Sequence, residues 1–159
     1  MSGSGKTTAG RLIARHWDLP FTEMDTLAIG PGWSTPPDFV QVVEEVVSCP
    51  CWVVDSWGPA EVRASMWARA DTIVWLDYPK RVVLLRLFKR SFHRSWTREP
   101  LFGGNVETWR SWLSKDHPLV HAATTFEKRR RVIRELAADS DADLIRFEVP
   151  AELHQWLGR

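Results

Sequence analysis

The segment Gly3-Ser-Gly-Lys-Thr-Thr8 constrains this chain more than any other part of its sequence. It matches the second half of the phosphate-binding motif G-x-x-x-x-G-K-[ST]. Small residues let main-chain N–H groups surround a phosphate, and the N-terminus of the helix that follows adds a favourable dipole. The sequence therefore predicts that ATP and Mg²⁺ bind here, through Gly3, Ser4, Gly5, Lys6, Thr7 and Thr8. A flexible, Gly/Ser-rich N-terminus is the competing interpretation.

Within this loop, Lys6 is predicted to contact the β- and γ-phosphates, and the Thr7 hydroxyl to hold Mg²⁺. The first glycine of the motif would lie one residue before Met1, and the strand that normally leads into the loop is missing from the sequence. We therefore expect that Met1 is not the natural start and that about eight to ten residues of an apolar strand precede it. That strand would be the central one of the sheet, between strands predicted at 51–55 and 72–76.

Helical and extended segments alternate along the rest of the chain. Apolar spacing predicts helices at 6–17, 39–47, 61–68, 79–94, 106–114, 119–138 and 151–157. Short apolar runs predict strands at 21–27, 51–55, 72–76 and 144–149. This alternation is typical of an α/β fold with a mostly parallel sheet covered by helices on both faces, and the length of 159 residues fits one domain.

Acidic residues lie in or directly after the predicted strands. Asp55 follows the run CWVV, and in a parallel sheet the C-terminal strand ends face the ligand crevice. Asp55 is therefore predicted to hold Mg²⁺ through water or to orient an acceptor hydroxyl. Asp77 follows TIVWL, and its place before Tyr78-Pro79 fits a turn residue better. Glu23 and Asp25 are predicted to share one strand face; we expect Asp25 to bind the acceptor or the metal, and a solvated face is equally open for Glu23.

A basic segment without any acidic residue runs from Lys80 to Arg98. Arg86, Arg90 and Arg94 are spaced by four, so one helix face carries all three, and such a face is best explained by an anion that it meets. Arg90 and Arg94 are predicted to act on the migrating phosphoryl group, and Arg86 on the substrate. A solvated face is the first alternative, and it is also expected for the later basic cluster at 128–131.

A nucleic-acid surface is the second alternative, because Phe88, Phe92 and Trp96 interleave the charges. We expect the apolar residues at 84, 85, 88 and 92 to form a buried stripe, which argues against stacking on bases. The net charge of only +1 also makes nucleic acid an improbable partner. No apolar run approaches the roughly 20 residues needed to cross a bilayer. Cys49 and Cys51 are too close in sequence for a good disulfide, so we expect reduced cysteines in a cytoplasmic protein, with a monomer favoured.

These segments together resemble the adenylate-kinase-like P-loop proteins labelled DNA-topology-modulation proteins, which are relatives of the nucleoside monophosphate and shikimate kinases. The resemblance covers most of the chain. It is carried by GSGKTTAGRLIARHWDLPFTEMDTL at 3–27, WVVDSW at 52–57, WARADTIVWLDYP at 67–79, LFGGNVETW at 101–109 and HAATTFEKRRR at 121–131.

The resemblance implies a three-layer α/β/α P-loop fold with a five-stranded parallel sheet, an acceptor-binding segment at about 26–47 and a mobile lid at about 90–125. It also implies that Asp25 faces the acceptor, that Arg63 is the nearest counterpart of an acceptor-binding arginine, and that the arginines of the 86–94 helix serve the lid. The implied activity is transfer of the γ-phosphoryl group of Mg-ATP to a nucleotide or a small hydroxyl metabolite. A nucleotide-binding regulator or ATPase without an acceptor is the alternative.

Overall fold

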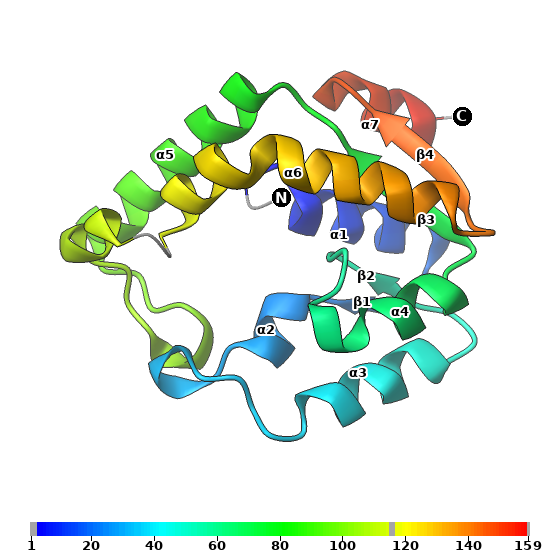
Figure 1. The fold of residues 1–159 in the computed structure, drawn as a ribbon, viewed down its shortest axis with the longest axis horizontal. Coiled ribbons are helices and arrows are strands. Elements are labelled where there is room, and N and C mark those ends of the chain that lie inside the picture. Colours follow the sequence, from blue (N-terminus) through cyan, green and yellow to red (C-terminus); the bar gives the residue numbers. More distant parts are fainter. Residues whose placement is uncertain (1–2, 115–116, 159) are drawn as a thin grey trace.

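The computed structural model describes residues 3–114 and 117–158 as an α/β structure rich in helices. The helices are α1 (Lys6–Trp17), α2 (Met24–Ala28), α3 (Phe39–Ser48), α4 (Ala60–Arg69), α5 (Lys80–Thr97), α6 (Pro118–Ala138) and α7 (Pro150–Leu157). Three 3-10 helices join them: η1 (Pro31–Trp33), η2 (Phe102–Gly104) and η3 (Trp109–Leu113). The strands are β1 (Phe21–Thr22), β2 (Val53–Val54), β3 (Thr72–Leu76) and β4 (Asp143–Phe147). Figure 1 shows α5 and α6 side by side, with α3 and α4 at the opposite side of the molecule.

The strands form two separate parallel pairs instead of the single predicted sheet. β1 pairs with β2, with Phe21 opposite Val53, and β3 pairs with β4 along their full length from Thr72–Asp143 to Leu76–Phe147. The predicted parallel orientation is confirmed, but one continuous sheet is not formed by the described residues. A cavity of about 500 Å³ lies between β2 and β3, and its lining includes Ile13, Val53, Val54, Ile73, Val74 and Trp156.

The side chains are buried in two clusters. The first joins α1, β3, α5, α6, β4 and α7 around Leu76, Val83, Leu87 and Phe126. The second joins α2, α3 and α4 around Phe39, Val43, Val62 and Met66. In the second cluster α3 buries Phe39, Val43 and Val47, because a helix buries the face on which its apolar residues recur. No helix among the described residues has the length and apolar character that crossing a membrane requires.

One predicted strand is wrong in its second half. The sequence predicts a strand over 21–27, but β1 ends at Thr22 and helix α2 begins at Met24. The Met24 N–H donates to Asp55 Oδ1 at 2.9 Å, so a side chain takes the place of the next ladder hydrogen bond. Glu23 and Asp25 therefore do not share a strand face. Likewise, residues 109–113 form a 3-10 helix within the segment predicted as an α-helix.

The buried face of α5 also differs from the predicted one. The structure buries Val83, Leu87, Ser91 and Ser95, which recur every four residues. Leu85, Phe88 and Phe92 are instead 56%, 49% and 46% exposed, so the predicted buried stripe is wrong at these three positions, while Leu84 is partly buried and packs against the first cluster. The exposed rings contact each other and the rings of η3: the ring centre of Phe92 lies 5.4 Å from that of Trp109, and the ring centre of Phe88 lies 5.7 Å from that of Trp112. Small serines on the inner side let the helix backbone approach its neighbours closely, which the hydrophobic pattern does not reveal.

Candidate functional site

A cavity of about 1,340 Å³ lies between the two buried clusters. Its walls come from the loop before α1, the start of α2, the start of α4, the inner face of α5, the loop 99–107 and the start of α6. The structure brings together around it all of the residues that the sequence singles out, namely Gly3, Ser4, Gly5, Lys6, Thr7, Thr8, Asp25, Asp55, Arg63, Arg86, Arg90 and Arg94. They come from segments up to about ninety residues apart, so only the fold could assemble them.

The loop before α1 depends on glycine at two positions. Gly3 has φ +79° and Gly5 has φ +91°, both in the left-handed region that favours glycine. A Cβ on Gly3 would also lie 2.4 Å from the Leu87 side chain of α5, so the loop backbone is in direct contact with that helix. α1 begins at Lys6, directly after Gly5, and its N-terminus faces the cavity with Lys6 and Thr7 in its first turn.

Asp55 connects this loop to the start of α2. Its Oδ2 accepts a hydrogen bond from Thr7 Oγ1 at 2.5 Å, and its Oδ1 accepts from the Met24 N–H at 2.9 Å. A hydroxyl and a carboxylate oxygen are therefore adjacent at the cavity wall. Mg²⁺ in nucleotide sites is held by one or two such oxygens together with phosphate and water oxygens, so this pair fits the ion. The described residues contain no group of three or more His, Cys, Asp or Glu side chains that could hold a metal alone.

Cationic side chains from three helices meet beside the loop. Burial is the main cause that lowers the pKa of Lys6, Arg90 and Arg129, and positive neighbours add to it in each case. Asp25 and Asp55 act in the opposite direction on Lys6. Arg90 Nε is buried and has no hydrogen-bond partner among the described residues. A polyanion in the cavity would relieve all of these costs, because it supplies both negative charge and acceptor oxygens.

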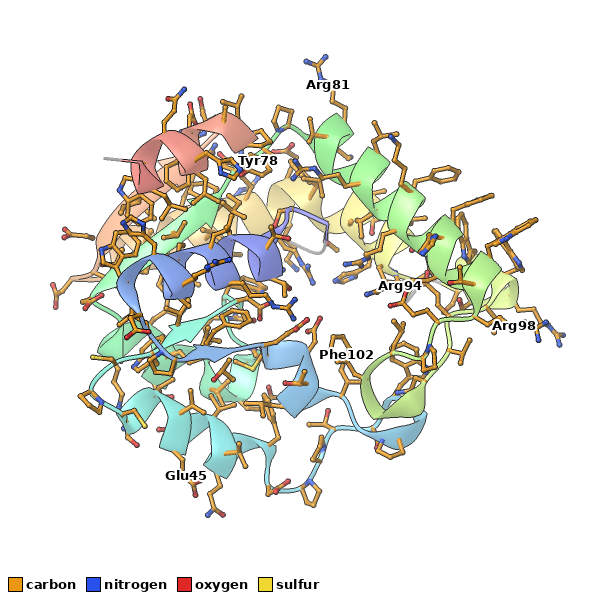
Figure 2. All side chains as sticks on the ribbon, turned by 180° about the vertical axis from the view of Figure 1, so that it is seen from behind. Glu45, Tyr78, Arg81, Arg94, Arg98 and Phe102 are labelled. Atoms are coloured by element: carbon orange, nitrogen blue, oxygen red, sulfur yellow. The ribbon has the colours of Figure 1, made fainter. Side chains whose placement is uncertain are left out.

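The basic run on α5 divides into inward and outward side chains. Figure 2 shows Arg94 on the inner side of the helix, whereas Arg81 and Arg98 point away from the molecule. Arg86 lies against the loop before α1, where its Nη1 donates to Ser4 O at 3.3 Å. Its guanidinium also lies 5.3 Å from the Tyr78 ring centre. The geometry thus associates Arg86 with the loop, while its predicted role toward the substrate stays a prediction.

Arg63 and Arg129, which both line the cavity, form a group with Trp57. The guanidinium carbon of Arg63 lies 4.0 Å from the Trp57 ring centre, and that of Arg129 lies 5.6 Å from it. Arg63 Nε donates to Gly58 O at 3.0 Å, which fixes the side chain over the ring. Sequence reasoning missed Trp57, and it expected the basic cluster containing Arg129 to form a solvated face. The ring comes from the segment between β2 and α4, and the two arginines come from α4 and α6, so no local sequence signal links all three.

The remaining acids have different surroundings. Asp25 is exposed on α2 and lines the cavity, and its predicted contact with the acceptor or the metal stays a prediction. Glu23 is paired with Arg11 of α1 at 2.8 Å, and both residues also line the cavity. Asp77 is buried and accepts from Arg130 Nε at 2.7 Å and from Arg146 Nε at 2.8 Å. Asp77 therefore has a structural role, and Arg130 of the basic cluster is not a solvated side chain either.

A buried acid–histidine pair, which the sequence analysis also missed, stabilises the loop 99–107. Glu107 and His117 are 6% and 3% exposed, and His117 Nε2 lies 2.9 Å from Glu107 Oε1. His117 Nδ1 accepts from the Leu119 N–H at 3.3 Å, so it caps α6. Because Nδ1 accepts, the proton of a neutral ring lies on Nε2 and is donated to Glu107. The pair thus attaches the loop to the first turn of α6.

Comparisons with known proteins give a partial similarity to kinases. The chain is 32% identical, over 102 residues, to the shikimate kinase of Synechococcus elongatus, and equally so to that of a second Synechococcus strain. The similarity covers 55% of this chain, and the chain spans about half (54%) of the length of these relatives. No family model and no solved structure matches the chain. The similarity supports a kinase-like P-loop protein, and the short parallel strand pairs among helices are consistent with a P-loop kinase fold.

Proposed function

We propose that this protein is a small-molecule kinase that binds Mg-ATP at Gly3–Thr8 and transfers the γ-phosphoryl group to an acceptor in the same cavity. The observation that carries this proposal is the set of desolvated cations beside the loop, above all Arg90, whose buried Nε has no partner among the described residues. Keeping such charges buried lowers stability, so a phosphate ligand is the simplest reason for their arrangement. The partial similarity to shikimate kinases agrees with this reaction class.

Each residue then has a distinct task in the proposed reaction. Bound Mg-ATP supplies the phosphoryl group and the metal charge. Lys6 neutralises the phosphates from the start of α1, while Arg90 and Arg94 stabilise the negative charge that develops on the migrating group. Thr7 and Asp55 offer the oxygen pair on the metal side, and their hydrogen bond fixes both side chains before the ligand binds. Arg86 stabilises the loop through Ser4 O.

The acceptor is proposed to lie between α2 and the Trp57 group. Asp25 would accept a hydrogen bond from an acceptor hydroxyl, and Arg63 would bind an anionic substituent. Arg129 approaches the same tryptophan from α6, so two cations are available on that side. Under this proposal, residues 26–47 form the acceptor-binding segment and residues 90–125 the lid of a single domain.

Calorimetric titration of ATP in the presence of MgCl₂ tests the first half of the proposal. We expect binding to the wild-type protein and loss of binding in Lys6→Ala, with Lys80→Ala, an exposed lysine at the start of α5, as the matched control. Absence of ATP binding to the wild-type protein would refute the proposal. ADP release across a panel of hydroxyl and phosphate acceptors tests the second half. ATP binding without any acceptor-dependent ADP release would favour the alternative of a nucleotide-binding regulator or ATPase.

A further inference from the structure

Two tight turns meet at the mouth of the cavity, far from the phosphate-binding loop in sequence. One is the turn at Gly30 before η1, and the other is η2 in the loop 99–107. The Gly103 backbone approaches Gly30 so closely that a Cβ on Gly103 would lie 2.4 Å from Gly30 C and 2.6 Å from Pro31 N. Figure 1 shows that this contact joins the α2–α3 side of the molecule to the end of α5.

One buried side chain adds a specific bond to this backbone contact. Asn105 is 9% exposed, and its Nδ2 donates to Gly30 O at 3.0 Å and to Phe102 O at 2.6 Å. It therefore satisfies a carbonyl on each turn with a single amide group. Gly30 itself is buried, so its carbonyl would lose a partner if Asn105 moved away.

Each turn is also internally rigid. Gly30 N–H donates to Ser34 O at 2.7 Å, and Leu101 N–H donates to Asn105 O at 2.7 Å. Pro100 and Val106 form an antiparallel bridge at the base of the second turn. The contact between them is therefore made by two preformed surfaces, which can separate and rejoin without unfolding either one.

Both turns border the cavity, with Trp33 from one side and Phe102 and Glu107 from the other among its lining residues. In Figure 2, Phe102 lies beside α2, where the two sides meet. Two residues beyond Asn105, the Glu107–His117 pair attaches the same loop to α6. The loop thus connects the acceptor-binding segment to the helix that carries Arg129.

We propose that Gly30, Gly103 and Asn105 form a latch that holds the acceptor-binding segment against the lid, and that the two turns open together. Gly103 and Asn105 are positioning residues, since they act through the segment that they hold. That opening of the latch lets the acceptor enter and leave rests on the proposed kinase function, whereas the joint opening of the two turns does not. The latch also explains why the sequence GGN occurs in this loop: the first glycine allows the close approach, and the asparagine bonds to the carbonyl across the contact.

Two neighbouring glycines provide a matched test. Gly103→Ala and Gly104→Ala place an alanine at similar positive φ, +64° and +73°, but a Cβ on Gly104 meets nothing within 4 Å. Both variants therefore strain the turn, and only Gly103→Ala pushes against Gly30. The measurement is amide hydrogen exchange by mass spectrometry in peptides covering 26–36 and 99–106, together with the dissociation constant of Mg-ATP.

For Gly103→Ala we expect exchange about five- to tenfold faster in both peptides, which corresponds to the loss of a hydrogen bond and its packing. Gly104→Ala should change only the peptide 99–106. Unchanged exchange at 26–36 in Gly103→Ala, or an equal effect of both variants there, would overturn the latch. If Gly103→Ala does not fold, Asn105→Ala replaces it with the same expectation. Failure of the wild-type protein to bind Mg-ATP would refute the kinase proposal and leave the exchange result to decide on the latch.

Discussion

The two acids that directly follow β2 and β3 give the sharpest test of the site. Asp55 and Asp77 occupy equivalent places in the sequence, directly after an apolar run, yet their partners differ. Asp55 bonds to the Thr7 hydroxyl and the Met24 N–H, whereas Asp77 is enclosed by Arg130 and Arg146. We therefore expect Asp55→Asn to impair magnesium-dependent ligand binding and Asp77→Asn to impair stability.

The magnitudes follow from what each asparagine can still do. In Asp55→Asn the amide oxygen can still accept from the Met24 N–H. The Nδ2 group that replaces Oδ2 can only donate, so the charged hydrogen bond from Thr7 becomes a neutral one in the reverse direction, a loss of about 1 kcal/mol. In Asp77→Asn two guanidinium groups lose their common counter-charge. Breaking a fully buried pair costs about 3–5 kcal/mol, but the side chains of Arg130 and Arg146 are 28% and 37% exposed, and screening reduces the expected loss to about 2–3 kcal/mol.

For the magnesium dependence of ATP binding we expect the larger effect in Asp55→Asn and the smaller one in Asp77→Asn, the reverse of their effects on stability. Removing a partner of a metal ligand typically lowers metal affinity about 10- to 100-fold, so Asp55→Asn should bind ATP almost equally in MgCl₂ and in EDTA. Asp77→Asn should keep the magnesium dependence of the wild-type protein. Calorimetric titration gives the affinities, and urea unfolding gives the free energies. The assignment of the metal side to Asp55 is wrong if Asp77→Asn loses the magnesium dependence while Asp55→Asn retains it.

Three further variants test separate parts of the structure. Lys6→Met should raise the free energy of unfolding at pH 7, measured by urea titration. Burial lowers the pKa of Lys6 in the folded protein, so the unfolded chain binds the proton more readily, and the resulting loss of folding stability is fully present at pH values below the folded pKa. An unchanged or lower free energy of unfolding would argue against a desolvated lysine. Gly10→Ala should lower stability by about 1–3 kcal/mol, although alanine favours helices, since a Cβ would lie 2.5 Å from the Phe21 ring; a gain in thermal unfolding temperature would contradict this packing. Near-neutral charge predicts no binding of fluorescent oligo(dT) at physiological salt; because Trp96 is 74% exposed, salt-sensitive anisotropy that disappears in Trp96→Ala would instead establish a stacking surface.

The sequence predicts the helices well because their signal is local. Apolar spacing alone places α1, α4 and α6 within one or two residues of their observed bounds. The motif at Gly3–Thr8 and the four-residue spacing of Arg90 and Arg94 are also local features. The motif predicts a phosphate-binding loop, and the arginine spacing predicts a helix face that meets an anion. The structure brings both segments to the lining of the same cavity.

The errors arise where a distant residue decides the local structure. The strand predicted through Asp25 stops because Asp55, thirty-one residues after Met24, bonds to the Met24 N–H. The burial of α5 is misjudged because Ser91 and Ser95 face the interior and leave Phe88 and Phe92 outside. Apolar periodicity treats serine as a surface residue, so it cannot detect a helix that is close-packed through small side chains.

The cavity lies between the two buried clusters, so a ligand bound in it contacts both of them. α1, α5 and α6 contribute to the first cluster, while α2, α3 and α4 contribute to the second. Within the described residues, links between the two sides include the hydrogen bonds of Asp55, the contact of Arg129 with Trp57 and the Gly30–Asn105 bond, and all of these lie at the cavity. A ligand that touches both sides therefore adds to these links, so its binding energy should depend on residues at the junction more than on residues inside either cluster. That is why Asp55, at the junction, should control ligand binding, whereas Asp77, inside the first cluster, should control stability.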